Sequence, residues 1–445
     1  MDLLLALFIR LLVFLAHFSR PLSRLHIASF DAWKPGKKRK LLLVGYNGAR
    51  NTGADARVVA IVRQLKTVFD PEDIAITVMT LNKDSLEGYF DPDVTLLEFS
   101  SVFLFDLFKA CSSHHAAILC EGSTLKSTFA NALTMFFCEA SGIMKNQHKP
   151  CIAFGSEIGH MEEFLEKLSK DLCDDTYFIT RTDDSTKNLR ALGLPGHTGT
   201  DTAWFYDQAI PKEEAHALLR EAGWDGKKEL LGLAVIDPFC WPVRSSLLKW
   251  IRGILSGNMS HQYDKWYFFS VSDKRRQAFY HYIDEIAKTA NAFIKAHDAF
   301  PVIIGMERLD KEACDLLKSK LNTPSALFWS GDTDAGKLSG ILRSLSILIT
   351  SRYHAAVLSM ETAIPILAVT MDERLLYIFK ELSFHKKYLF KVSDKELSDK
   401  LYPALEQAYL HKEEIKEHIN EGFLQYRKKQ LQMGIFLKQY LTDRL

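Results

Sequence analysis

The chain has 445 residues, of which 47% are hydrophobic, so it is long enough for two α/β domains with separate cores. Its 56 Lys and Arg nearly balance 55 Asp and Glu, and a net charge of +1 excludes the overall basic excess that is typical of nucleic-acid-binding proteins. The seven cysteines are spread singly without a C-x-x-C pair, which indicates reduced, mostly buried thiols in the cytosol rather than a disulfide framework or a zinc site.

The first 38 residues predict a membrane-associating segment. Residues 3–18 are apolar except for Arg10 and His17. A helix of that length reaches ~24 Å, which is shorter than the ~30 Å hydrocarbon layer of a bilayer. We therefore favour a helix that lies in the membrane interface over a single span or a cleaved signal peptide, and expect the basic residues near lipid phosphates to be Lys34, Lys37, Lys38, Arg39 and Lys40. This predicts a cytoplasmic protein at the inner face of the membrane, either peripheral or anchored.

Short apolar runs then alternate with helical patterns, which predicts parallel sheets. The first series of strands is expected at residues 40–44, 74–80, 94–99, 117–120, 151–154 and 176–180, with helices at 54–67, 126–145 and 184–192. The second series of strands is expected at residues 230–235, 266–270, 302–304, 326–329, 347–349 and 366–369.

These elements predict an α/β fold of two doubly wound Rossmann-like domains that face a cleft, with an N-terminal apolar or amphipathic helix and a helical C-terminal tail. The expected division is a membrane-associating segment at 1–38, an N-terminal Rossmann-like domain at 39–205, a hinge at 206–228, a C-terminal Rossmann-like domain at 229–393 and the tail at 394–445.

Glycine and polar residues follow the first core strand, at the sheet edge where open α/β sheets bind ligands. Gly48 and Gly53 allow a tight turn and close approach of a ligand to backbone N–H groups. Asn51 either caps the helix that follows or contacts the ligand, and Asp55 either complements the helix dipole or acts as a base. The loop has neither the Gly-Lys-Ser/Thr of a P-loop nor the G-x-G-x-x-G spacing of a dinucleotide site.

Three more candidates follow later strands of the first half. Glu121 and Ser123 come after the fourth predicted strand, and Arg181 comes after the sixth. Arg181 either binds an anionic ligand or forms an ion pair with Asp183 or Asp184. These side chains should reach the same sheet edge as the glycine loop.

The segment Ser351-Arg352-Tyr353-His354 is the most informative of the chain. It stands between an apolar run and a helical pattern, so Arg352 and His354 should lie at the carboxyl end of a strand. A fixed cation beside a group that titrates near neutral pH suits an anionic substrate that undergoes proton transfer. The alternatives are a structural salt bridge for Arg352 and a buried core histidine for His354. Ser351 and Glu307, which ends another strand, are further candidates for substrate binding.

Taken in order from Leu41 to about Arg374, these segments resemble the polysaccharide pyruvyl transferase family. The matching pieces are the loop from Gly45 to Asp55, the turn at 154–159, Arg181 with Ser185 and Leu189, Thr200-Asp201-Thr202-Ala203, Ser351-Arg352-Tyr353-His354 and Ala363-Ile364-Pro365-Ile366. Cys120-Glu121-Gly122-Ser123 stands where many members have a run of glycines, which indicates a divergent member. Characterised members move the pyruvyl unit of phosphoenolpyruvate onto a sugar, usually as a ketal, and their fold resembles that of GT-B glycosyltransferases.

The resemblance implies a transferase that uses phosphoenolpyruvate as donor and a glycan or lipid-linked sugar as acceptor, with no cofactor and no metal ion. Phosphoenolpyruvate has a carboxylate and a phosphate, for which Arg352 and Arg181 are the expected partners. His354 is the expected acid or base, and Asp55 or Glu121 would orient the sugar or act as a second base.

Two other functions fit the same sequence. One is a GT-B-type glycosyltransferase that uses a nucleotide sugar, and the other is a catalytically silent, membrane-associated glycan-binding protein. Release of phosphate from phosphoenolpyruvate, rather than of nucleotide from a nucleotide sugar, separates the first alternative from a pyruvyl transferase.

Overall fold

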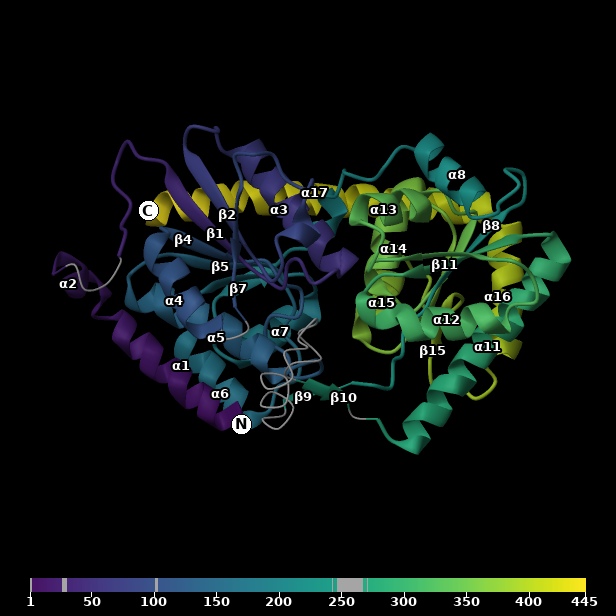
Figure 1. Ribbon diagram of the computed structural model, residues 1–445, viewed down its shortest axis with the longest axis horizontal. Helices are drawn as coiled ribbons and strands as arrows, with labels where there is room; N and C mark the ends of the chain where they lie inside the picture. The colour runs from purple at the N-terminus through teal and green to yellow at the C-terminus, as the bar shows by residue number, and fades with distance from the viewer. Residues whose placement is uncertain (1, 26–29, 101–102, 242, 246–266, 270) are drawn as a thin grey trace.

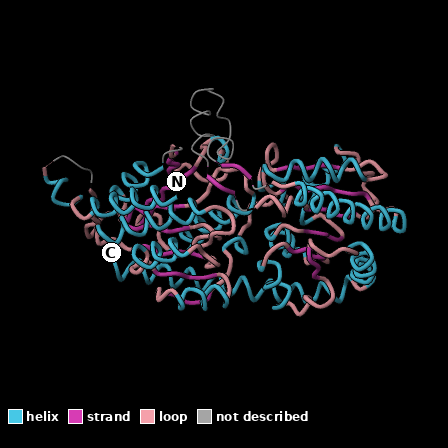
Figure 2. Tube along the Cα trace, turned by 90° about the horizontal axis from the view of Figure 1, so that it is seen from below, coloured by secondary structure: helices cyan, strands magenta, loops and turns pink. Residues whose placement is uncertain are grey.

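Two parallel β-sheets, each flanked by helices, form two lobes that lie side by side (Figure 1). The computed structural model describes residues 2–25, 30–100, 103–241, 243–245, 267–269 and 271–445. In a view from below, the strands of each lobe lie inside and helices lie outside (Figure 2). The prediction of two doubly wound α/β domains is confirmed.

The first sheet has seven strands in the order β3-β2-β1-β4-β5-β6-β7. They are β1 (Arg39–Val44), β2 (Ile74–Thr80), β3 (Thr95–Glu98), β4 (Ala116–Leu119), β5 (Cys151–Ser156), β6 (Tyr177–Thr180) and β7 (Gly196–Thr198). The helices of this lobe are α3 (Thr52–Val68), α4 (Phe103–Ser113), α5 (Asn131–Asn146), α6 (Glu163–Leu172) and α7 (Asp183–Ala191), with the 3-10 turns η1 (Asp84–Leu86) and η2 (Thr202–Phe205). All of β4 is buried, as expected for a central strand that is covered on both faces.

The second sheet has six strands in the order β12-β11-β8-β13-β14-β15. They are β8 (Leu230–Ala234), β11 (Phe300–Gly305), β12 (Ala326–Trp329), β13 (Ile347–Thr350), β14 (Ile366–Thr370) and β15 (Leu389–Lys391). The helices of this lobe are α8 (Lys212–Glu221), α11 (Asp273–His297), α12 (Lys311–Lys320), α13 (Ala335–Arg343), α14 (Tyr353–Ser359) and α15 (Glu373–Glu381), with η3 (Arg308–Asp310) and η4 (Met360–Thr362). In each sheet the strand order reverses once, between β1 and β4 and between β8 and β13.

One predicted strand does not join the sheet in which the sequence placed it. Tyr267–Phe269 forms β10, which pairs antiparallel with β9 (Val243–Ser245) in a separate two-stranded sheet. An aromatic run favours a strand but does not identify the strand with which it pairs. Residues 266 and 270, which the prediction also included, lie outside the described part of the chain.

Two other boundaries differ from the prediction. The helix expected at residues 126–145 begins only at Asn131, because the backbone N–H of Lys126 donates to Thr134 Oγ1 at 3.0 Å and holds the preceding segment as a loop. The edge strands β7 and β15 were not expected from the sequence, since three residues are too few to form a recognisable pattern.

The N-terminal segment forms α1 (Asp2–Ala16) and α2 (Ser19–Arg24) on the outside of the first lobe. α1 packs against α5, and Ile9, Leu12 and Val13 are buried. Arg10, one of the two polar residues of the apolar stretch, forms an ion pair with Asp171 at 2.7 Å. None of the described helices has the length and apolar character needed to cross a bilayer.

The C-terminal tail forms α16 (Leu397–Leu410) and α17 (Lys412–Arg444), and α17 crosses from the second lobe back to the first (Figure 1). The ring of Tyr426 stacks on that of Trp204 with 4.3 Å between centroids. Near the C-terminus, Tyr440 donates its hydroxyl to the carbonyl of Cys151 at 3.0 Å. α17 therefore joins the two lobes.

The lobes also contact each other directly. The backbone N–H of Thr52, at the start of α3, donates to the carbonyl of Met306 at 2.9 Å. The backbone N–H of Ala335 in the second lobe donates to the hydroxyl of Tyr89 in the first at 2.7 Å. The first bond fixes the start of α3 against the end of β11, and the second joins Tyr89 to the start of α13.

Candidate functional site

A cleft lies between the two lobes, with about 800 Å³ of empty space that includes open solvent. The first lobe contributes Tyr46, Asn51, Gly53, Ala54, Glu121, Gly122, Ser123, Phe129, Leu133 and Arg181, and the second contributes Trp241, Met306, Glu307, Arg352, Tyr353, His354 and Arg374.

The cleft lies at the carboxyl ends of the strands. Asn51 follows β1 and Glu121 follows β4, so these two residues flank the point where the strand order of the first sheet reverses. Arg352 and His354 follow β13, which lies at the corresponding point of the second sheet. Open α/β sheets bind ligands at such points.

Arg352 is held by two carboxylates. Its Nη2 donates to Glu307 at 2.8 Å, and its Nε lies 3.0 Å from Asp310. Burial raises the pKa of Asp310 to about 7, although Arg352 opposes this shift. Arg352 itself keeps its charge, because Asp310 and Glu307 raise its pKa against the effect of burial. The guanidinium is therefore a fixed cation at the cleft.

His354 lies between the two lobes. Its Nε2 is 3.7 Å from Asp201 of the first lobe. A Cβ atom added at Gly53, also in the first lobe, would lie 1.9 Å from His354 Nδ1, so only glycine allows the imidazole to fit here. Burial lowers the pKa of His354 to about 4, even though Asp201 raises it. The imidazole is therefore neutral near pH 7.

Asp201 also pairs with two buried arginines. Arg57 Nε lies 3.4 Å from one of its oxygens, and Arg181 Nη1 donates to the other at 3.1 Å. Burial alone would raise the pKa of Asp201, but the Arg57 guanidinium holds it well below its usual range. Asp201 is therefore an anion beside a neutral imidazole.

Arg181 is positioned by both lobes. Its partners among the described residues are Asp201 and Glu157, not the Asp183 or Asp184 of the alternative prediction. The guanidinium also lies 5.0 Å from the ring centroid of Tyr353 in the second lobe, at cation–π distance.

The structure adds a third arginine that the sequence reasoning missed. Arg374 follows β14 and lines the cleft, where its Nε donates to Asp372 at 2.7 Å. Its guanidinium lies 5.1 Å from the ring centroid of Phe129. The position of Arg374 just after a strand was a usable signal, since the same reasoning identified Arg352.

Lys126 and Arg57 were also missed. Lys126 Nζ contacts Glu157 of its own lobe and Glu373 of the other lobe, both at 2.7 Å, and so joins the lobes beside the cleft. Arg57 is fully buried in α3, 3.6 Å from Glu121. The only sequence signal for Arg57 was its charge within an apolar stretch of α3. No feature of the sequence distinguished Lys126 from a surface lysine.

Eight of the predicted site residues line this cleft, namely Asn51, Gly53, Glu121, Ser123, Arg181, Glu307, Arg352 and His354. The other three lie behind it. Gly48 has a positive φ of 73° and donates its N–H to Asp55 at 3.3 Å. Asp55 is buried, and burial raises its pKa to about 7. Ser351 forms a hydrogen bond with the hydroxyl of Tyr282 at 2.7 Å.

Asn51 is the N-cap of α3, as one of its two predicted roles requires. Its side-chain oxygen accepts hydrogen bonds from the N–H groups of Gly53 at 3.1 Å and Ala54 at 3.2 Å. Asn51 also lines the cleft, so the cap does not exclude a ligand contact.

The charged groups that line the cleft favour an anion. They are three arginines and two glutamates, beside a neutral His354. Guanidinium groups match the planar oxygens of carboxylates and phosphates, and a neutral imidazole can accept a proton. In the described part of the chain, no group of three or more His, Cys, Asp or Glu is arranged to hold a metal ion.

Comparisons with known proteins identify the family and the fold. The sequence model of a family described as polysaccharide pyruvyl transferase matches residues 51–373. No curated protein matches the chain significantly.

Among solved structures, a putative UDP-N-acetylglucosamine 2-epimerase from Listeria monocytogenes is similar with 12% identity and a TM-score of 0.56, over 86% of this chain and 91% of that one. The UDP-GlcNAc 2-epimerase from Neisseria meningitidis, bound to UDP-GlcNAc, has 10% identity and a TM-score of 0.56, and the match covers 91% of this chain and 100% of that one. Anabaena Alr3699/HepE in complex with UDP-glucose has 10% identity and a TM-score of 0.55, and the match covers 91% of this chain and 99% of that one. At these identities the likeness shows the fold, which is GT-B-like.

Proposed function

The chain belongs to the polysaccharide pyruvyl transferase family, and from this premise we propose that it transfers the pyruvyl (enolpyruvyl) unit of phosphoenolpyruvate to hydroxyls of a glycan or lipid-linked saccharide. The observation on which the proposal depends is the set of three arginines in the cleft, Arg181, Arg352 and Arg374, beside a neutral His354.

The arginines suit the two anionic groups of phosphoenolpyruvate. A guanidinium has five N–H donors in a plane. Arg352 uses its Nε and Nη2 on Asp310 and Glu307, so further N–H groups are available to a carboxylate or phosphate. Existing ion pairs hold each guanidinium in place, which lowers the entropy that binding would cost.

The proposed reaction forms a ketal between the central carbon of phosphoenolpyruvate and two hydroxyls. Of the two hydroxyl protons, one ends on the methylene carbon, which becomes a methyl group, and the other leaves with the phosphate. His354, neutral in the free site, accepts a hydroxyl proton, and the Asp201 carboxylate stabilises the imidazolium that results. The negative charges of the donor, once bound, raise the basicity of His354 further.

The acceptor sugar fits best on the side of the cleft formed by Phe129 and Trp241. These rings come from different lobes and meet edge to face at 5.0 Å between centroids. Aromatic rings offer an apolar surface to the carbon face of a sugar, and polar neighbours fix its orientation. Glu121 lines the cleft and is the nearer candidate for orienting a hydroxyl, whereas Asp55 lies behind it.

A GT-B-type glycosyltransferase that uses a nucleotide sugar is the second candidate. It is favoured by the fold, since two of the similar structures contain UDP-GlcNAc or UDP-glucose. Those ligands belong to proteins with 10% identity to this chain, so we rank this function below pyruvyl transfer.

The experiment that tests the proposal uses purified protein, phosphoenolpyruvate labelled in the pyruvyl carbons and membrane glycolipids as acceptor, with no added cofactor or metal ion. We expect label in the glycolipid and an equal amount of released phosphate. A parallel reaction receives UDP sugars in place of phosphoenolpyruvate. Release of UDP with sugar transfer, and no transfer of pyruvyl label, would support the second candidate instead.

A further inference from the structure

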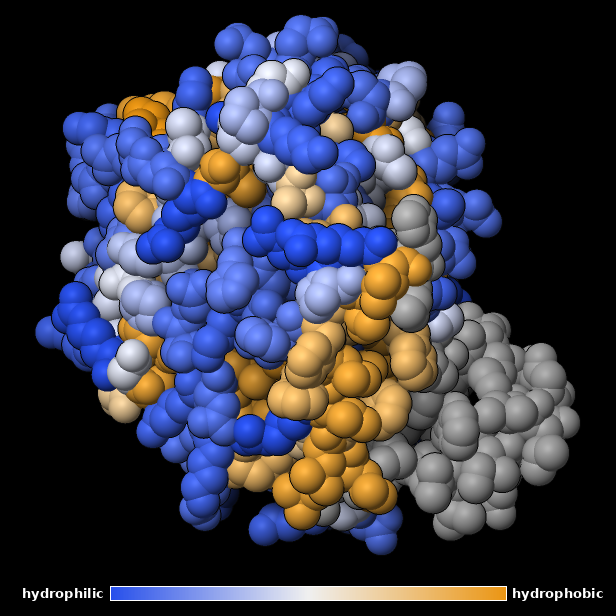
Figure 3. Space-filling model, turned by 90° about the vertical axis from the view of Figure 1, so that its left-hand side faces the viewer, coloured by the Kyte–Doolittle hydropathy of each residue, from blue (hydrophilic) through white to orange (hydrophobic). Residues whose placement is uncertain are grey.

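α1 presents a second apolar face to the outside of the molecule. Large apolar side chains recur on it at helical spacing, and Leu4 is 72%, Leu7 65% and Phe14 59% exposed. The other exposed members on α1 are Leu3, Phe8, Leu11 and Leu15. Phe18, just beyond α1, and Phe105 of α4 extend the surface, and the rings of Phe8 and Phe105 lie 5.9 Å apart between centroids. Figure 3 faces this side and shows hydrophobic residues gathered in one patch bordered by hydrophilic ones. Patches of this kind mark interaction sites.

The patch is a permanent feature, because α1 is held firmly on the lobe. Asn146 donates a side-chain N–H to the carbonyl of Val13 at 2.7 Å. A Cβ atom added at Gly142 of α5 would come within 2.9 Å of Val13, which shows how closely the two helices pack. The ion pair of Arg10 with Asp171 adds a third attachment. α1 could not rotate its outer face inward without exposing the side chains that it now buries.

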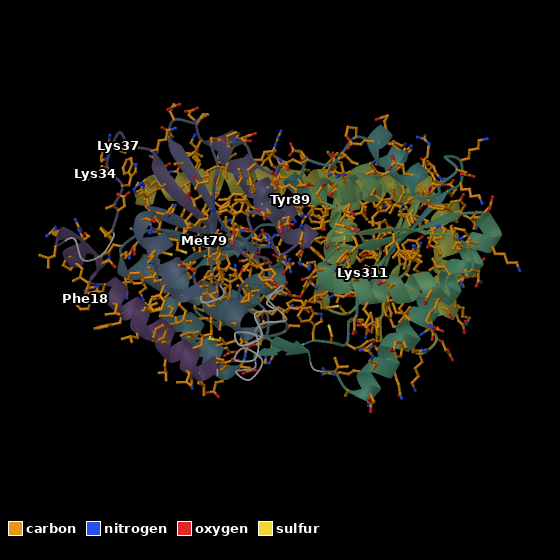
Figure 4. The ribbon with its side chains drawn as sticks, in the orientation of Figure 1. Phe18, Lys34, Lys37, Met79, Tyr89 and Lys311 are labelled. Carbon is orange, nitrogen blue, oxygen red and sulfur yellow. The ribbon has the colours of Figure 1, made fainter. Side chains whose placement is uncertain are left out.

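Positive charge lies beside the patch, at the C-terminal end of α1. Residues 1–40 contain eight Lys and Arg but two Asp, although the whole chain is nearly balanced. Arg20, Arg24, Lys34 and Lys37 are exposed, and within the described ranges none of them has an ion-pair partner. Phe18, Lys34 and Lys37 all lie at the end of the molecule that α1 and α2 occupy (Figure 4).

We propose that α1 and α2 form a rigid platform that binds the surface of a bilayer containing anionic lipid. The 15 residues of α1 reach only ~22 Å, so the helix lies in the interface instead of crossing the ~30 Å hydrocarbon layer. Its apolar side chains enter the layer, and the cations around it meet the lipid phosphates.

A second copy of the chain is a poorer occupant. A two-fold interface through α1 would place the same patch, and the same set of cations, opposite itself. Both sets of cations, Arg20, Arg24, Lys34 and Lys37 of each copy, would then gather at one interface and repel each other, whereas an anionic membrane neutralises them.

Binding to lipid stands independently of the transfer reaction. If both hold, the platform fixes the height and direction of the cleft relative to the membrane, and acceptors attached to lipid become the accessible ones. The binding test uses no substrate, so its failure and the failure of the transfer reaction are separate results.

The test measures flotation of the full chain with phosphatidylcholine vesicles, with and without phosphatidylserine. We expect binding to the anionic vesicles that weakens as salt is added. The double variant Leu7→Asp/Leu11→Asp should bind about tenfold less or worse, because charged groups enter the apolar layer poorly. Leu424→Asp is the matched control, since Leu424 is 67% exposed on α17, away from the platform, and this variant should bind like the wild type.

Charge is tested separately with Arg20→Gln, Arg24→Gln, Lys34→Gln and Lys37→Gln combined. Binding to anionic vesicles should fall by roughly fivefold for each cation that lies near the surface. Circular dichroism and thermal unfolding confirm that each variant is folded. Equal binding by the wild type and Leu7→Asp/Leu11→Asp would overturn the proposal. A dimer that this variant abolishes, together with no vesicle binding, would assign the patch to a second copy instead.

Discussion

At the scale of single residues, Asp201 connects two side chains of the cleft, Arg181 and His354, with the buried Arg57. Arg57 and Arg181 contact its carboxylate, and His354 lies 3.7 Å from it. Because the arginines keep Asp201 ionised, it is ready to stabilise a proton taken up by the imidazole. In the proposed reaction, the site would therefore hold a base and its counter-ion before any substrate arrives.

The roles of His354 and Arg352 can be separated by kinetics. His354→Ala should lower kcat about 10²–10⁴-fold, as expected for lost acid–base catalysis, with little change in phosphoenolpyruvate binding. Arg352→Lys keeps the positive charge that pairs with Asp310 and Glu307 but loses the planar guanidinium with its paired N–H donors. KM for phosphoenolpyruvate should therefore rise more than kcat falls. Arg276→Lys, on an exposed helix, should change neither constant. An unchanged kcat for His354→Ala would exclude the proposed proton transfer.

Asp55→Asn should alter how stability depends on pH. Burial raises the pKa of Asp55 from 3.8 to about 7, so between these values the folded protein keeps a proton that the unfolded chain has lost. The contribution of Asp55 to the free energy of unfolding therefore falls as pH rises through this window, whereas an amide does not titrate. From about pH 5 to about pH 7 the variant should gain roughly 2–3 kcal/mol relative to the wild type. Urea unfolding at several pH values measures the difference, and a constant difference would contradict this reasoning.

At the scale of elements, the start of α3 links helix formation to the site. Asn51 caps the helix, and Gly53 in its first turn allows the approach of His354 from the other lobe. The backbone N–H of Thr52 is bonded to the end of β11, so the helix start also fixes the distance between the lobes.

Substitutions of Asn51 test whether this residue contacts the substrate in addition to capping α3. Asn51→Ala should lower the free energy of unfolding by about 1 kcal/mol, whereas Asn51→Ser should keep most of it, because serine is also a good N-cap. We expect Asn51→Ser to retain activity as well. Chemical unfolding and steady-state kinetics give both values, and a stable but inactive Asn51→Ser would show that Asn51 contacts the substrate.

The sequence predicts those parts of the site that lie directly after strands. Arg352, His354 and Arg181 could be found because apolar runs end just before them, and parallel strands bring their ends to one edge. Arg57 and Lys126 could not, since their partners Asp201 and Glu373 are distant in the sequence and belong to other segments. The prediction that residues 266–270 join the second sheet was wrong for the same reason. β10 pairs with β9 instead, and the choice of partner strand depends on tertiary contacts.

At the scale of the whole molecule, the lobes are joined beside the cleft and by α17. Lys126 bridges to Glu373 beside the cleft, and Tyr426 of α17 contacts both Trp204 in the first lobe and Glu381 in the second. A continuous helix of 33 residues spans roughly 50 Å, enough to reach across both lobes. The sequence predicted this tail as helical, but its contacts with the first lobe follow only from the structure.

A break in α17 should loosen the lobes. Lys428 is exposed on α17, so Lys428→Pro removes a backbone hydrogen bond and costs roughly 3 kcal/mol or more without touching the cleft. We expect calorimetry to show a lower midpoint and separate transitions for the lobes, with a reduced kcat/KM. Lys428→Ala suits a helix and is the control. A single transition at the original midpoint in Lys428→Pro would show that α17 does not hold the lobes together.

The contact between Gly53 and His354 has a consequence for how the enzyme responds to acid. Burial lowers the pKa of this imidazole to about 4, and Gly53 of the opposite lobe is among the residues that cover the ring, so separation of the lobes would rehydrate it and raise its pKa toward 6.5. Between about pH 4 and 6.5, acidification would therefore favour separation of the lobes, because the rehydrated imidazole would bind a proton that the covered one does not.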